Sequence, residues 1–342
     1  MQSIAILGAG TWGTALAALL AGNGKRVAVW SALPEEVETF SSARYHPYLD
    51  IAIPPSIVYT ASMEEACGGK DVILFAVPSV FVRETARKAA PFLREGQIVV
   101  DVAKGIERET LLTLSGVISD EFEKAGKSGI SPVALTGPTH AEEVARRMPT
   151  VIVAAGRDPA AVEAVRAFFS CDCLRVYPSS DVSGAELCGA LKNIIALASG
   201  VSSGLGYGDN TRAAIITRGM AEIARLGRAM GCDEDTFSGP AGIGDLIVTA
   251  TSEHSRNFRA GVLLGRGKTV EEALSEVGMV VEGVNALPAA LALAEKYEVD
   301  LPIAFAVDAV VNRSADPRAM VLDLMKLGRN AFRKERKTRL NG

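Results

Sequence analysis

The chain has 342 residues, of which 48% are hydrophobic, and its formal net charge is −4. This length is typical of two domains, and the negative charge gives no electrostatic case for a nucleic-acid partner. No apolar stretch approaches the roughly twenty residues that cross a bilayer, and the first residues lack the pattern of a signal peptide. The five cysteines have neither metal-ligand spacing nor the density of a small secreted domain. We therefore expect a cytoplasmic protein with reduced thiols, in which the basic segment Arg329 to Arg339 is a solvated terminus.

The first half of the chain alternates short runs rich in Val and Ile with helical segments. Continuous apolar strands separated by helices are typical of a parallel sheet that is covered on both faces, and right-handed crossovers then give a doubly wound domain. The predicted strands are Ile4–Leu7, Val27–Trp30, Val72–Ala76, Ile98–Val102, Val133–Leu135, Val151–Ala154 and Leu174–Val176. Predicted helices between them include Thr14–Ala21, Val80–Ala90 and Ala160–Phe169.

The strand pattern stops at about Pro178, and only helical periodicity follows. We therefore expect an α/β fold with a Rossmann-type domain over residues 1–180 and an all-α domain over residues 181–342, with a cleft between them. The predicted helices of the second domain are Val182–Ser199, Thr211–Met230, Leu246–Thr251, Arg256–Leu264, Val270–Glu276, Asn285–Glu298, Ile303–Val311 and Arg318–Met325.

A glycine motif, Gly8-Ala9-Gly10-Thr11-Trp12-Gly13, follows the first predicted strand directly and precedes a helical run. In this context Gly8 permits the tight turn, Gly10 lets the backbone approach a pyrophosphate, and Gly13 allows close packing of helix on sheet. The anion then lies at the helix N-terminus, where unpaired N–H groups favour negative charge. The motif predicts a bound dinucleotide.

The end of the second strand, Val29-Trp30-Ser31-Ala32, bears on the choice between NADH and NADPH. It lacks the acidic residue that commonly bonds the ribose 2′-hydroxyl and would repel a 2′-phosphate. No arginine follows at once, since Arg44 lies several residues further on. The pattern favours NADPH slightly.

Lys192-Asn193 lies in an apolar run of small residues between Glu186 and Ala196. An ammonium there is costly unless it has a partner or a task, so Lys192 is the candidate acid/base. Lys104 follows the strand Ile98–Val102 and would point towards the expected cleft, although taken alone it suggests an exposed loop lysine.

Three further segments carry polar groups at places suited to a ligand. Gly137-Pro138-Thr139-His140 leads from a strand into a helix, with Pro138 near the first helical turn, and the free backbone N–H groups of this segment suit an anion. We interpret His140 as a lining or packing residue. Ser255-Arg256-Asn257 offers a planar guanidinium fork for a phosphate, or is a surface helix start. Val280-Val281-Glu282-Gly283 brings a carboxylate near the cofactor ribose, or ends a strand-like loop.

The glycine-rich segment Gly239 to Gly244 precedes Asp245, which is either a helix cap or a ligand. If the helix persists, Asp245, Thr249, Ser252 and Arg256 share one face. A polar helix face that carries both positive and negative side chains is better suited to binding a polyhydroxylated phosphate than to packing in a hydrophobic core.

Taken together, these motifs resemble the bacterial NAD(P)-dependent glycerol-3-phosphate dehydrogenases over almost the whole chain. The resemblance rests on segments in the family's order: Gly8–Ala17, Ala103–Glu107, Gly137–Glu143, Glu186–Ala196, Gly206–Thr211, Gly239–Thr249, Ser255–Asn257 and Val280–Gly283. It implies reversible hydride transfer between NADPH or NADH and dihydroxyacetone phosphate, which gives sn-glycerol 3-phosphate for glycerophospholipid synthesis. It also suggests a homodimer. Two positions depart from the family pattern, namely His140, where an aromatic residue is common, and Ser31-Ala32, where a basic residue or histidine is common.

The resemblance also implies roles for individual residues. Lys192 would be the proton donor and acceptor, supported by Lys104 and Asp245. The implied cofactor contacts are Gly8, Gly10, Thr11, Trp12, Gly13, Lys104, Ala141, Arg256, Val280 and Glu282. The implied substrate contacts are Lys104, Gly137, Thr139, Lys192, Asn193, Asp245, Thr249, Ser255, Arg256 and Asn257.

Two alternatives stay open at this point. A β-hydroxyacid or phosphogluconate-type dehydrogenase also combines a Rossmann domain, a helical partner domain and a lysine, although the loop Gly239–Asp245 and Ser255–Asn257 argue against it. The second alternative is a dinucleotide-sensing protein that has lost its catalytic activity. The sequence does not support such a loss, because Lys104, Lys192, Asp245 and Arg256 are all present. Only three histidines occur, without metal-ligand spacing, so no metal site is predicted.

Overall fold

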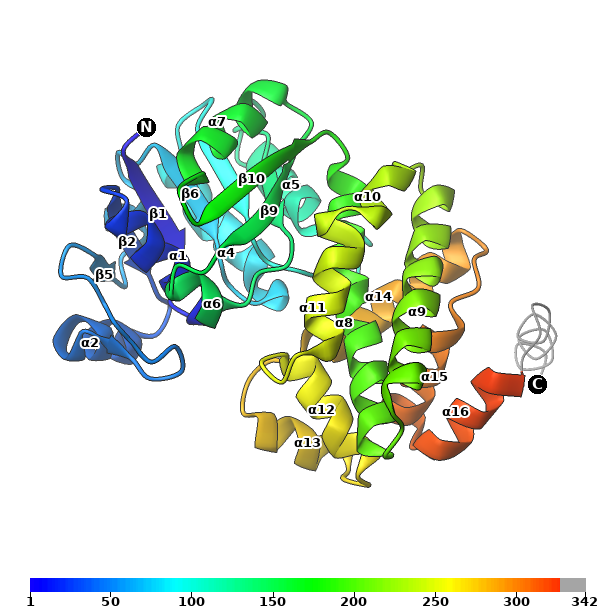
Figure 1. Ribbon diagram of the computed structural model, residues 1–342. Coiled ribbons are helices and arrows are strands. Elements are labelled where there is room, and N and C mark those ends of the chain that lie inside the picture. The colour runs from blue at the N-terminus through cyan, green and yellow to red at the C-terminus, as the bar shows by residue number, and fades with distance from the viewer. Residues whose placement is uncertain (327–342) are drawn as a thin grey trace. The chain divides into compact units, whose positions relative to one another are not determined.

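The computed structural model describes residues 1–326 (Figure 1). The chain forms two compact units: Met1–Glu107 with Leu112–Glu186, and Arg108–Leu111 with Leu187–Gly342, the latter described as far as residue 326. The basic segment Arg329 to Arg339 lies outside the described residues. Within residues 1–326, no helix has the length and apolar character needed to cross a membrane.

The first unit is built on an eight-stranded sheet with the order β10-β9-β8-β7-β6-β1-β2-β5. Its apolar strands carry buried side chains on both faces, as a sheet covered by two helical layers requires. The strands are β1 (Ser3–Leu7), β2 (Arg26–Trp30), β5 (Val58–Thr60), β6 (Val72–Phe75), β7 (Ile98–Asp101), β8 (Val133–Thr136), β9 (Thr150–Ala155) and β10 (Leu174–Ser179). A separate hairpin pairs β3 (Tyr45–His46) with β4 (Ile51–Ala52).

Helices cover the two faces of this sheet and complete two hydrophobic cores. Alternate residues of β1 show the division, since Ile4 and Ile6 belong to one core, and Ala5 and Leu7 to the other. The first core is closed by α1 (Thr11–Gly22), α2 (Pro34–Ala43), α6 (Ala141–Ala145) and α7 (Pro159–Phe169). The second is closed by α3 (Met63–Cys67), α4 (Val82–Ala89) and α5 (Leu114–Lys124), with 3₁₀ turns at Ser79–Phe81 and Ala90–Phe92.

The strand order reverses at β1, which pairs in parallel with β2 on one side and β6 on the other. Such a switch point opens a crevice at the carboxyl ends of the strands, where doubly wound folds bind ligands. The glycine motif after β1 therefore lies at the topological position that suits a dinucleotide.

The second unit contains only helices among its described residues. The chain enters it within α8 (Val182–Gly204) and continues through α9 (Asp209–Ala229), α10 (Glu234–Ser238), a π-helical turn (Pro240–Gly244), α11 (Asp245–Thr251), α12 (Arg256–Gly265), α13 (Val270–Val277), α14 (Glu282–Lys296), α15 (Pro302–Arg313) and α16 (Pro317–Lys326). Glycines let α8 and α12 touch backbone to backbone: a Cβ added to Gly200 would stand 2.1 Å from the Phe258 carbonyl oxygen.

The predicted fold class is confirmed: a parallel-dominated sheet with helices, followed by a helical unit. The expectation of an all-parallel sheet is wrong at one pair, because β9 runs antiparallel to β8 and β10 follows β9 in parallel. Periodicity did not indicate this reversal, since β9 is buried on both faces whichever way it runs.

Candidate functional site

The glycine loop after β1 has the geometry of a phosphate-binding turn. Gly8 has φ +125° and a Cβ there would lie 2.6 Å from the Ala76 carbonyl oxygen, while a Cβ on Gly13 would lie 2.1 Å from the Gly8 carbonyl oxygen. Gly10 is different, since nothing lies within 4 Å of an added Cβ. No side chain caps the first turn of α1, which begins at Thr11. This N-terminus therefore presents backbone N–H groups towards open space, as a pyrophosphate requires.

A second group of predicted residues meets at the Gly137 carbonyl, where the end of β8 leads towards α6. Its oxygen accepts hydrogen bonds from Lys104 Nζ at 3.3 Å and from Thr139 Oγ1 at 3.1 Å. Pro138 lies just before α6, which begins at Ala141 with His140 as its N-cap. Helix α6 packs against α1, which carries the glycine loop (Figure 1).

Two buried carboxyl groups that were not predicted as site residues support the Lys104 loop and the start of α8. Asp101 ends β7, and its Oδ1 accepts from the Ala103 N–H at 3.0 Å, which fixes the turn leading to Lys104. Burial, with the nearby Glu186 charge, raises the pKa of Asp101. Glu186 accepts from the backbone N–H of Ser115 at 2.8 Å and from its hydroxyl, and burial raises the pKa of Glu186 too.

Lys192 lies on α8 with 5% of its surface exposed, and its ammonium has partners on α11. It forms an ion pair with Asp245, which is 1% exposed, and donates a hydrogen bond to Thr249 Oγ1 at 2.7 Å. Thr249 in turn donates to the Asp245 backbone carbonyl at 2.6 Å. The ammonium is thus held by two groups spaced four residues apart on one helix face.

The chain changes its helical geometry just before Asp245. The turn Pro240–Gly244 is π-helical, a geometry often found at functional sites. Asp245 is the first residue of α11, and Gly244 is its N-cap. The condition for a shared face with Arg256 is not met: α11 ends at Thr251, where the sequence predicted its end, and Ser252 has extended backbone.

The predicted residues around Arg256 form the start of α12. Ser255 is its N-cap, and the Ser255 hydroxyl accepts from the Phe258 N–H at 3.2 Å. Asn257, interpreted as a ligand, is buried and bonded on both sides: its Nδ2 donates to Asn193 Oδ1 at 3.0 Å, and its Oδ1 accepts from the Gly283 N–H at 2.7 Å.

These bonds join three helices near Lys192. Gly283 is the second residue of α14, so Asn193 of α8 and Asn257 of α12 fix the N-terminus of α14. A strand-like loop was one expectation for Val280–Gly283; instead Val281 is the N-cap and Glu282 the first residue of α14. Arg256 and Glu282 remain partly exposed beside this buried amide chain.

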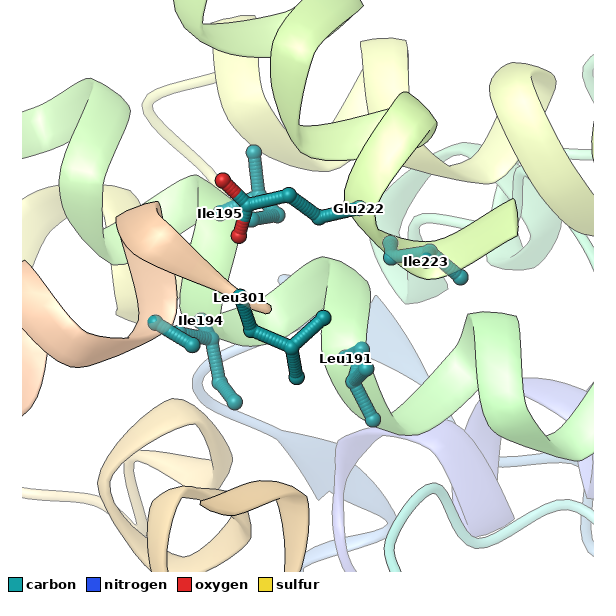
Figure 2. Close-up of a pocket in the computed structure, with 7 residues that line it drawn as sticks. Leu191, Ile194, Ile195, Glu222, Ile223 and Leu301 are labelled. Atoms are coloured by element: carbon teal, nitrogen blue, oxygen red, sulfur yellow. The ribbon is translucent and has the colours of Figure 1, made fainter. Parts of the chain in front are cut away.

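Other side chains of α8 line a largely apolar pocket (Figure 2). Leu191, Ile194 and Ile195 line it together with Glu222 of α9 and Leu301. Burial raises the pKa of Glu222 to about 8, and its carboxyl group accepts from the Ile303 N–H at 2.8 Å, in the first turn of α15. Glu222 was not predicted; its polar group caps a buried helix start, and the pocket belongs to the core of the unit.

The fold and these sites define a nicotinamide dinucleotide-dependent dehydrogenase class: a glycine-loop Rossmann unit, followed by a helical unit with a buried, acid-paired lysine. Family models agree with this class. The N-terminal model of the NAD-dependent glycerol-3-phosphate dehydrogenases matches residues 3–162, and the C-terminal model matches residues 181–322. The chain belongs to this family.

Individual relatives are similar along nearly the whole chain. A glycerol-3-phosphate dehydrogenase [NAD(P)+] 2 of Lactobacillus delbrueckii subsp. bulgaricus is 61% identical, over 95% of this chain and 97% of its own. A glycerol-3-phosphate dehydrogenase [NAD(P)+] of Agathobacter rectalis is 49% identical, over 95% and 96%. The crystal structure of the glycerol-3-phosphate dehydrogenase of Coxiella burnetii superposes with a TM-score of 0.89 at 33% identity, over 95% of this chain and 99% of that chain.

Proposed function

We propose that this chain is an NAD(P)-dependent oxidoreductase that interconverts dihydroxyacetone phosphate and sn-glycerol 3-phosphate, with Lys192 as its proton donor and acceptor. Membership of the family supports the reaction. The observation that carries the role of Lys192 is its burial together with two fixed partners, Asp245 and Thr249. A buried ammonium is expensive, and the chain provides it with an oriented position on α8.

The first unit fits a dinucleotide. The uncapped N-terminus of α1 and the open space at Gly10 suit the pyrophosphate, with Gly8, Thr11, Trp12 and Gly13 forming the turn around it. Ala141, on a helix that packs against α1, and Lys104 are the further contacts we assign in this unit. When bound, the reduced nicotinamide supplies the hydride.

Lys192 supplies the proton. In the reductive direction Nζ donates a proton to the carbonyl oxygen of the ketone while the carbon receives hydride; in oxidation the neutral amine accepts the hydroxyl proton. Asp245 and Thr249 hold Nζ in place, which keeps the donor oriented during transfer. Assistance of this kind is worth about 10²- to 10⁴-fold in rate.

The remaining predicted residues are assigned to binding. Arg256 is proposed for the phosphate of the substrate or of the cofactor, because a partly exposed guanidinium offers a bidentate fork. Binding energy from such a remote group positions the reacting carbon. Asn193 and Asn257 keep the start of α14 in place for Val280 and Glu282, which we assign to the cofactor. Gly137, Thr139 and Ser255 complete the proposed substrate contacts.

We place this reaction in the cytoplasm, as part of glycerophospholipid synthesis, and infer a homodimer that has no nucleic-acid partner. The net charge of −4 supports the last inference. Light scattering of the purified chain coupled to gel filtration tests the dimer, which a monomeric mass would contradict.

A substrate panel tests the proposed reaction. The purified chain is mixed with NADH or NADPH and with dihydroxyacetone phosphate, unphosphorylated dihydroxyacetone or a β-keto acid, and the absorbance of the reduced nicotinamide is followed. We expect rapid oxidation with dihydroxyacetone phosphate alone. Preference for the β-keto acid would instead indicate a β-hydroxyacid dehydrogenase, and dinucleotide binding without turnover would indicate a sensor.

A further inference from the structure

The carboxyl end of β2 carries an acidic group that does not follow it in the sequence. Ser31, the residue after β2, is 3% exposed, and its hydroxyl donates to Glu36 Oε2 at 2.6 Å. The same hydroxyl accepts from the Leu33 N–H at 3.1 Å. Helix α2 begins at Pro34, so its first turn brings Glu36 back to the strand end. A carboxylate is therefore held where Ser31-Ala32 alone indicated none.

This carboxylate lies at the strand edge that leads to the dinucleotide loop. In the β1–β2 register, Leu7 pairs with Trp30, and the Gly8 N–H donates to the Trp30 carbonyl at 2.9 Å. Ser31 is fixed further by its own N–H, which donates to the Thr60 carbonyl at 3.2 Å. In doubly wound dinucleotide domains, an acidic group at this strand end accepts from the ribose 2′-hydroxyl, whereas a 2′-phosphate is accommodated by a nearby arginine.

The other charged and titratable groups around Glu36 do not neutralise its carboxylate charge. Arg44, the C-cap of α2, directs its Nη1 to the Ile57 carbonyl at 2.8 Å. His46 is buried and stacks on Phe40, and burial lowers its pKa, which disfavours a positive charge there. Tyr59 is buried, and burial raises its pKa, which keeps it neutral. We therefore assign the 2′-substituent to Glu36, because the Arg44 guanidinium is directed to the Ile57 carbonyl.

We infer that Glu36, positioned by Ser31, makes this chain select NADH over NADPH. The inference rests on the proposed function, and it reverses the preference for NADPH that Ser31-Ala32 suggested. Glu36 accepts a hydrogen bond from the 2′-hydroxyl of NADH, whereas the same carboxylate meets the negative 2′-phosphate of NADPH with like charge and no donor.

Equilibrium binding of both dinucleotides tests this selection without turnover. NADH and NADPH are titrated into the full chain, and the dissociation constants are obtained from nicotinamide fluorescence. For the unaltered chain we expect NADH to bind at least about tenfold more tightly, which corresponds to about 1.4 kcal/mol. Glu36→Gln keeps the size of the side chain and an acceptor for Ser31, and should narrow the ratio about tenfold or more.

A matched control comes from the adjacent acid. Glu35 lies in the same first turn and is exposed, so Glu35→Gln changes the net charge equally and should leave the ratio unchanged. Arg44→Gln removes the positive charge nearest in sequence to α2 and should also leave the ratio of the two dissociation constants unchanged. The inference is overturned if Glu36→Gln and Glu35→Gln change the ratio of the two dissociation constants equally. It is also overturned if Arg44→Gln selectively loses NADPH binding, or if the unaltered chain binds NADPH more tightly than NADH.

The same titrations separate this inference from the proposed function. If neither dinucleotide binds the unaltered chain, the proposed function itself fails. If both bind and Glu36→Gln leaves their ratio unchanged, only the selection by Glu36 fails. Thermal melting checks that each variant is folded. If Glu36→Gln does not fold, Ser31→Ala releases the carboxylate from its fixed position and should weaken NADH binding more than NADPH binding; an unchanged ratio then overturns the inference.

Discussion

Replacing Lys192 by methionine removes an ammonium and keeps an unbranched apolar stem of similar length. In the folded chain this leaves Asp245, 1% exposed, as a buried carboxylate without its cation. Removing one member of a buried ion pair costs about 3–5 kcal/mol of stability, because the remaining charge stays desolvated. We therefore expect Lys192→Met to be clearly less stable towards urea. The acid/base role predicts a separate loss of turnover.

The size of that second loss follows from the proposed chemistry. Without the proton donor, kcat for dihydroxyacetone phosphate should fall by about 10² to 10⁴, or about 2.7 to 5.5 kcal/mol in the barrier. Binding of NADH should stay nearly unchanged, because Lys192 is not among the proposed cofactor contacts. Steady-state turnover with saturating substrate and NADH fluorescence titration measure the two effects independently.

A double variant separates stability from chemistry. Adding Asp245→Asn to Lys192→Met removes the carboxylate charge that Lys192 no longer neutralises and should recover much of the stability, while turnover stays low. Thr249→Val keeps the ammonium and removes one hydrogen bond, and should reduce turnover far less. A folded Lys192→Met chain that turns over within about tenfold of the unaltered one would refute the acid/base role.

Three further changes test other parts of the account. Arg256→Ala should mainly raise KM for dihydroxyacetone phosphate, and an unchanged KM would place the phosphate elsewhere. Gly13→Val places a side chain where a Cβ already meets the Gly8 carbonyl oxygen at 2.1 Å, so NADH titration should show lost binding; normal affinity would contradict this. Burial raises the pKa of Glu222 from 4.5 to about 8, so the folded chain holds this proton more tightly than the unfolded chain does. The resulting stabilisation of the folded chain is fully present below about pH 4.5 and is lost as the pH rises through about 8. Melting temperatures should therefore fall less from about pH 5 to about pH 9 in Glu222→Gln, and equal falls would contradict the raised pKa.

Local patterns were sufficient for the strands and helices with strong periodicity. The apolar runs that became β1 and β6 and the helix that became α8 carry their signal within a few residues. Segments with weak patterns were missed. Only Phe40 is buried in α2, and β5 has three residues, too few for an alternating pattern.

Contacts between distant residues explain most of the remaining differences at the sites. Lys192 and Asp245 were both singled out from the sequence, but their ion pair depends on how α8 packs on α11. Asn257 was interpreted as a substrate ligand, but its buried bonds to Asn193 and Gly283 could not be predicted from the local sequence. The position of Glu36 could not be predicted from the residues directly after β2, because one turn of helix returns this later side chain to the strand end.

The central claim is that this chain reduces dihydroxyacetone phosphate with a nicotinamide cofactor. The most direct test is to incubate the purified chain with NADH and dihydroxyacetone phosphate and to quantify both the NADH consumed and the product by mass spectrometry. We expect equal molar amounts of NADH oxidised and glycerol 3-phosphate formed, with the sn-glycerol 3-phosphate stereoisomer alone. NADH that binds but is not consumed, or a consumption without glycerol 3-phosphate, would contradict the account.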